Sequence, residues 1–170
     1  MVATTSSSNV KGGAQLTLHM TALLITGSVI VQLQNTVLLP IAWIIHGVIL
    51  VFLFAPSHET VHRTAFSSNL ANQITGHMCG FMICLPYGFF RCFHLHHHRH
   101  TQDTENDPEL QTAKPQNLRQ YLWYMSGIPY WSGQTRTLFT HALGRVDEKY
   151  VFSNQRNSVC VEARVYLLLY

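Results

Sequence analysis

Residues 12–58 read GGAQLTLHMTALLITGSVIVQLQNTVLLPIAWIIHGVILVFLFAPSH and contain no Asp, Glu, Lys or Arg. One helical crossing of a bilayer needs about 20 apolar residues, so this stretch is long enough for two. Its most polar point, residues 32–36, is the natural place for a connecting turn. The sequence therefore predicts an integral membrane hairpin with helices at about residues 16–33 and 37–57.

The composition supports a membrane protein. Only 11% of the residues are charged, whereas a soluble domain has about 25%. A cleaved secretory signal would need an apolar core of about 7–15 residues and a small-residue cleavage site, so the length of this stretch argues against one. The net charge of +3 is small and scattered along the chain. We therefore expect no nucleic-acid partner.

The predicted fold class is all-α, with helices at the membrane surface following the hairpin. A disordered tail is expected at residues 1–15, which are rich in Ser, Thr and Gly, before the hairpin at 16–57. A histidine-rich, metal-binding region follows at 58–110. Clustered Tyr and Trp side chains, which favour headgroup depth, indicate an interfacial helix and a cytosolic loop over 111–158. Residues 159–170 are interpreted as the start of a third membrane helix, truncated at the chain end.

The distribution of basic residues predicts the orientation of this multi-pass protein. Both ends of a hairpin lie on one side of the membrane, and that side carries Lys11, Arg63, Arg91 and Arg99. The connecting turn has no Lys or Arg. The positive-inside rule therefore places the histidine-rich region on the cytoplasmic side.

Two histidines follow the second apolar segment at a helical spacing. His58 and His62 are four residues apart in the sequence HETVH. Residues four apart on a helix share a face, with Cβ atoms about 5–6 Å apart. This pair can therefore ligate one metal ion.

A second group of five histidines lies between residues 94 and 100. Each residue of a helix turns about 100°, so His94, His97 and His98 share one face. His96 and His100 point to the opposite side. Imidazole binds iron, zinc, copper and nickel well, so the first three are candidate ligands. A nonspecific metal-binding histidine tract is the alternative.

The remaining histidines are isolated in the sequence and are expected to be structural. They are His19, His46, His77 and His141.

The two histidine groups together resemble the boxes of the membrane fatty acid desaturase family. His58-Glu-Thr-Val-His62 is similar to the family's HxxxH box, and His94-x-x-His97-His98 to its HxxHH box. The surrounding residues, 58–66 and 93–110, are also similar. The resemblance implies a di-iron centre with these five histidines as ligands and no further catalytic residue. Such a centre uses O₂ and two electrons to remove two hydrogens from an acyl chain.

The resemblance is incomplete at its C-terminal end. The family has a further HxxHH box after later membrane helices, and only His141 follows His100 here. We therefore expect the chain to be an N-terminal fragment that is inactive alone.

A carboxylate near the second group is a candidate for orienting a ligand. A metal-bound histidine usually donates its other N–H to a carboxylate or carbonyl, and Asp107 is the best candidate. A helix-ending turn formed by Asn106, Asp107 and Pro108 is an equally good explanation.

The partners implied by the resemblance are membrane lipids, a lipid acyl substrate and a ferredoxin or cytochrome b5-type electron donor. Carotenoid ketolases, carotenoid hydroxylases and alkane hydroxylases have similar boxes and remain alternatives. A membrane zinc protease is another, since His58-Glu59-Thr60-Val61-His62 matches HExxH. That interpretation leaves the second histidine group unexplained. A membrane protein that handles metal without catalysis is the last alternative.

Overall fold

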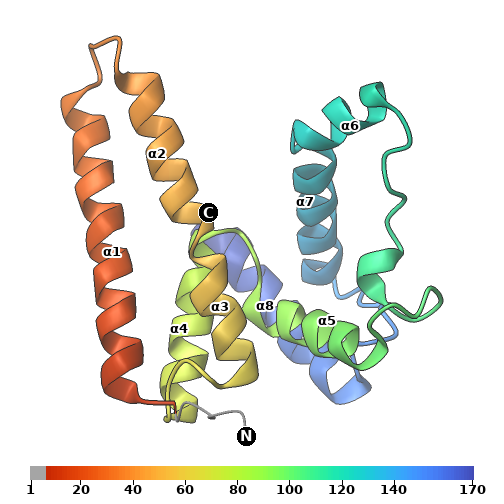
Figure 1. Ribbon diagram of the computed structural model, residues 1–170. Coiled ribbons are helices and arrows are strands. Elements are labelled where there is room, and N and C mark those ends of the chain that lie inside the picture. Colours follow the sequence, from red (N-terminus) through yellow and green to blue (C-terminus); the bar gives the residue numbers. More distant parts are fainter. Residues whose placement is uncertain (1–6) are drawn as a thin grey trace, which may run out of the picture. The chain divides into compact units, whose positions relative to one another are not determined.

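The computed structural model describes residues 7–170, and this part of the chain is helical with no strand, which confirms the predicted all-α class. The chain divides into two compact units, one ending at Ile83 and the other spanning Cys84–Tyr170 (Figure 1). The first unit contains α1 (Asn9–Gln32), α2 (Leu39–Val51), α3 (Phe54–His62) and α4 (Asn69–Met82). The second contains α5 (Tyr87–His100), the short 3₁₀ helix η1 (Pro108–Leu110), α6 (Leu118–Met125), α7 (Ile128–Ala142) and α8 (Ser153–Leu169).

The predicted hairpin is confirmed. Two candidate membrane spans, Asn9–Gln32 and Leu39–His62, lie in the described part of the chain, and the second comprises α2 and α3. The helices α1 and α2 lie side by side, joined by a short turn (Figure 1). Large apolar side chains cover their outer surface, which suits contact with lipid tails. Examples that are at least half exposed are Leu18, Leu24, Ile25, Val31, Ile41, Trp43 and Ile44.

The first membrane helix begins earlier than the sequence predicts. α1 starts at Asn9 rather than at residue 16, because the Ser8 side chain accepts a hydrogen bond from the Lys11 amide (3.5 Å) and caps the helix. A serine in this position satisfies one of the amides that the first turn leaves unpaired. The rest of the predicted tail, residues 1–6, lies outside the described residues.

The first turn of α1 packs directly against the loop that follows α3. A Cβ atom at Gly12 would lie 2.3 Å from the carbonyl oxygen of Ala65 and 2.9 Å from the Phe66 ring. The loop cannot easily withdraw, since the Asn72 side chain accepts from the Phe66 amide (3.2 Å) and donates to the Phe66 carbonyl (2.8 Å). The loop that follows the histidine pair of α3 is therefore held close to α1, at a point where α1 has a glycine, Gly12.

We expect Gly12→Ala to destabilise the protein. The added methyl group meets a backbone oxygen that is held in place, and overpacking of this kind costs about 1–3 kcal/mol. Thermal unfolding in detergent would measure the effect. Gly13→Ala is the matched control, because a Cβ atom there meets nothing within 4 Å. Equal melting temperatures for the two variants would contradict this account of the contact.

The second unit holds α5 against α8. The Glu162 carboxylate accepts hydrogen bonds from the backbone amides of Gly88 (2.9 Å) and Phe89 (3.3 Å), in the first turn of α5. An acidic group is favourable there because the amides of a helix N-terminus are otherwise unpaired. The apolar core of this unit contains Val146, Val151, Val159 and Cys160.

The C-terminal half differs from the sequence prediction in its boundaries. Two helices, α6 and α7, lie where the sequence predicts one interfacial helix, because Gly127 adopts a left-handed conformation (φ 73°) and the chain restarts as α7 with a proline in its first turn. The helix α8 begins at Ser153 rather than 159. Its membership of a third membrane span remains a prediction.

Candidate metal centre

The first histidine pair lies at the end of the second membrane span. His58 and His62 are both on α3, and their ring centroids are 4.8 Å apart. One ring nitrogen of each lies within 4.8 Å of the other. Both side chains are partly exposed. The helix ends immediately afterwards, since Arg63 has a left-handed backbone (φ 59°). The predicted sharing of a helix face by this pair is seen in the structure.

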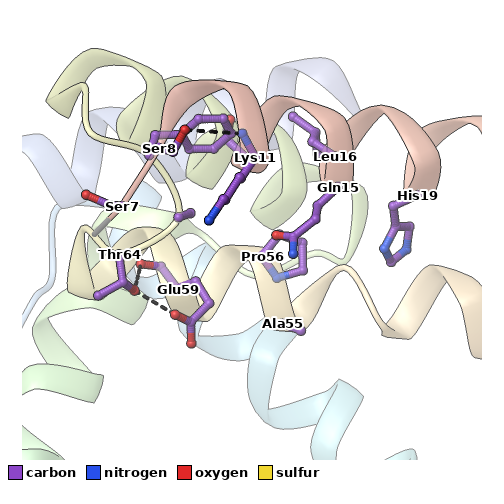
Figure 2. Close-up of a pocket in the computed structure, with 14 residues that line it drawn as sticks. Ser7, Ser8, Lys11, Gln15, Leu16, His19, Ala55, Pro56, Glu59 and Thr64 are labelled. Carbon is purple, nitrogen blue, oxygen red and sulfur yellow. Dashed lines mark hydrogen bonds between the residues drawn. The ribbon is translucent and has the colours of Figure 1, made fainter. Parts of the chain in front are cut away.

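A glutamate contacts the first of these histidines. The Oε1 atom of Glu59 lies 3.2 Å from Nδ1 of His58, and Oε2 accepts a hydrogen bond of 2.6 Å from the Thr64 hydroxyl. Glu59, Thr64 and Lys11 line a cavity of about 440 Å³. Figure 2 shows the three side chains among those that line it. From the sequence, Glu59 is predicted only as the base of the alternative protease. The signal for its contact with His58 is that the carboxylate directly follows a candidate ligand in the sequence.

The second histidine group lies on α5 and divides as the helical spacing predicts. The Nε2 atoms of His94 and His98 are 3.0 Å apart and form a hydrogen bond, and the His97 ring centroid lies 6.1 Å from that of His94 and 5.5 Å from that of His98. His96 and His100 form a separate pair with ring centroids 4.4 Å apart. His94 is buried, with 6% of its surface exposed. The structure therefore brings together the three histidines of the candidate ligand face.

Asp107 holds one of these three histidines. Its Oδ1 atom accepts a hydrogen bond of 2.8 Å from Nδ1 of His97 and a second from the Glu109 amide (3.0 Å), while Oδ2 accepts from the Gln102 amide (3.1 Å). Only 1% of Asp107 is exposed. Burial alone would raise the pKa of this carboxyl group, but the three hydrogen bonds hold the pKa below its usual value.

The contact with His97 agrees with the first alternative for Asp107, and its structural role is at the start of a helix rather than in a helix-ending turn. The residue caps the 3₁₀ helix η1 through its bond to Glu109, and the same carboxylate orients His97. With Nδ1 occupied as a donor, the His97 nitrogen left to bind a metal is Nε2, which lies 3.6 Å from the Glu109 carboxylate.

Three of the isolated histidines make structural hydrogen bonds. Within the first unit, His19 bonds the backbone oxygen of Ile49 and His46 bonds the Thr26 hydroxyl, both at 2.8 Å. In the second unit, His141 is 2% exposed and bonds Glu148 at 2.9 Å. The partners in these three bonds, Ile49, Thr26 and Glu148, are not candidate ligands.

The family model for fatty acid desaturases matches residues 35–170, a stretch that contains both histidine groups. The chain therefore belongs to the fatty acid desaturase family. It is 31% identical over 110 residues to an sn-1 oleoyl-lipid 12-desaturase of Anabaena variabilis, covering 56% of this chain and 31% of that relative. No solved structure matches the chain.

Other relatives share the same enzyme class. An sn-1 acyl-lipid omega-3 desaturase (ferredoxin) of Synechocystis is 31% identical over 85 residues, covering 50% of this chain and 24% of the relative. An endoplasmic reticulum omega-3 fatty acid desaturase of Nicotiana tabacum is 28% identical over 94 residues, covering 55% of this chain and 24% of the relative. The chain thus spans less than a third of the length of each of these three relatives. Family membership implies an oxidoreductase, and the two candidate spans agree with an integral membrane protein.

Proposed function

We propose that the complete protein containing this chain desaturates a fatty acyl chain with O₂ at a histidine-ligated di-iron centre. The observation that carries the proposal is the family match, which includes both histidine groups. The chain is also similar to acyl-lipid desaturases of cyanobacteria. His58, His62, His94, His97 and His98 are the proposed ligands from this part of the protein.

The chemistry of these residues fits iron. Neutral imidazole nitrogen is a good ligand for iron and adds no charge to the site. Two nitrogens that bind one ion at right angles, each at about 2.1 Å, are about 3.0 Å apart, and the Nε2 atoms of His94 and His98 have that separation. Bound iron would supply, with O₂, the oxidant needed to break an unactivated C–H bond.

The chain's own residues have a positioning role in this proposal. The Asp107 carboxylate fixes the His97 ring in the tautomer that leaves Nε2 for the metal. Glu59 is placed to do the same for His58 through Nδ1. The role proposed for the two carboxylates is therefore to hold the His97 and His58 imidazoles in fixed orientations.

We further propose a lipid-linked acyl substrate and a ferredoxin-type electron donor. The names of the cyanobacterial relatives include both an acyl-lipid substrate and ferredoxin. A cytochrome b5-type donor is the alternative. The charge distribution about the hairpin supports a cytoplasmic location for both histidine groups.

The test uses the complete natural protein in membranes. We expect about two irons per chain and the loss of two hydrogens from lipid acyl chains, dependent on O₂ and reduced ferredoxin. A hydroxylated or ketolated product under the same conditions would show that the protein is a related hydroxylase or ketolase and not a desaturase. One zinc per chain, with peptide cleavage abolished by Glu59→Gln, would instead establish the protease.

A further inference from the structure

The second membrane span is broken just before the histidine pair. The Leu53 amide donates to Leu50 (3.0 Å) and the Ala55 amide to Phe52 (3.0 Å), so both bonds reach three residues back instead of four. Pro56 explains the position of the break, since its ring clashes with the carbonyl four residues earlier and it has no amide to donate. The span is therefore two helices, α2 and α3, which meet at residues 52–53.

The break leaves a backbone carbonyl without its helical partner. The Ile49 oxygen would ordinarily accept from the Leu53 amide, which bonds Leu50 instead. An unpaired carbonyl at membrane depth is unfavourable, because no water is there to donate a hydrogen bond to it. His19 of α1 supplies the missing donor, with its Nε2 atom 2.8 Å from the Ile49 oxygen. A carbonyl only accepts, so Nε2 carries the hydrogen. Figure 2 shows the His19 ring extending from α1.

A second hydrogen bond between α1 and α2 lies away from the break. Nδ1 of His46 is 2.8 Å from the Thr26 hydroxyl. The Thr26 hydroxyl also donates to the Ala22 carbonyl (2.9 Å), so it keeps a partner without His46. The two bonds join the same two helices, but only the one made by His19 lies at the break.

The direction of α3 depends on the break. α3 has nine residues and carries both His58 and His62. At about 1.5 Å per residue, a tilt of about 10° at the start of such a helix moves its far end by about 2 Å. Metal–ligand distances tolerate about 0.2 Å. A small change at residues 52–53 is therefore enough to spoil a metal site built on α3.

We propose that His19 is a positioning residue that holds the break in the second span and thereby sets the direction of the helix bearing the first metal-ligand pair. The metal-binding half of this inference rests on the proposed function, whereas the structural half does not. His19 then contributes to the site from another helix, without contacting His58, His62 or the metal.

The test compares His19→Leu with His46→Leu in the complete natural protein. Each variant removes one bond of the same length between α1 and α2. We expect His19→Leu to speed backbone hydrogen exchange at residues 53, 54, 55 and 57 and to weaken Co²⁺ binding about 10–100-fold, the range for residues that orient ligands. His46→Leu should leave both nearly unchanged. His19→Gln, which keeps an N–H at similar reach, should restore both.

The outcomes separate this inference from the proposed function. Equal effects of His19→Leu and His46→Leu, or no rescue by His19→Gln, would overturn the positioning role. A parent protein that binds no metal would remove the proposed function and the metal half of the inference, while hydrogen exchange would still decide whether His19 holds the break. If His19→Leu does not accumulate, His19→Asn, whose amide is too short to reach Ile49, takes its place.

Discussion

His98→Ala should empty the proposed iron site, whereas His96→Ala, two residues away on the same helix, should leave it loaded. The Nε2 atom of His98 lies 3.0 Å from that of His94, close enough for one ion to bind both nitrogens in place of the hydrogen bond between them. The His96 ring instead lies beside His100, at 4.4 Å between centroids, and near Tyr150 at 5.7 Å. The His94 and His98 rings therefore belong to one candidate site with His97, and His96 and His100 form a separate pair on the other face of the helix.

The reason for an all-or-none effect is geometric. A metal ion takes ligands only from groups that converge on it, and an alanine at position 98 supplies no donor. His94→Ala and His97→Ala should behave in the same way, because their rings lie with His98 on one face of α5. His96→Ala removes an imidazole of equal size and chemistry from the opposite face, which makes it the matched control.

Iron per chain, measured on the purified complete protein, checks this prediction together with the desaturated lipid product. The variants should retain the helical content of the parent, since the substitutions favour helix. An iron-free His96→Ala beside an iron-loaded His98→Ala would show that the ligand face lies on the other side of α5. The proposed ligand set would then be wrong.

The parts of this structure that were predictable are those set by local sequence. The uncharged run at residues 12–58 is sufficient to predict the hairpin. In lipid, a single chain segment can pair its own backbone polar groups only as a helix. The spacing of His94, His97 and His98 is sufficient for their shared face. Both features follow from the periodicity of the helix and need no knowledge of other segments.

The remaining features depend on contacts between distant segments. The predicted single helix over residues 37–57 is wrong at the break between α2 and α3. The donor to the Ile49 carbonyl there is His19, thirty residues away in the chain. The close approach of α1 to the loop at Ala65 likewise depends on a contact between distant segments, with a glycine at position 12. Tertiary packing of this kind has no signal in a single sequence.

Asp107→Ala should weaken metal binding about 10–100-fold, the usual cost of removing a partner that orients a ligand. The substitution frees the His97 ring, which the carboxylate holds at 2.8 Å. It also releases the segment that follows α5. Gln102 has a left-handed backbone (φ 67°), unusual for a residue with a side chain, and its amide is held by Asp107. Both losses increase the number of orientations open to His97.

Asp107→Asn distinguishes these two contributions. An asparagine can keep its oxygen toward His97 and the Glu109 amide, but its NH₂ group would then face the Gln102 amide, so that two donors meet. We therefore expect binding between that of the parent and that of Asp107→Ala. Glu105→Ala, an exposed carboxylate in the same segment, is the matched control and should bind like the parent. Co²⁺ titration of the three variants measures the order. If Asp107→Ala binds as tightly as Glu105→Ala, then Asp107 only caps η1, and the orientation of His97 must be set by the packing of α5 alone.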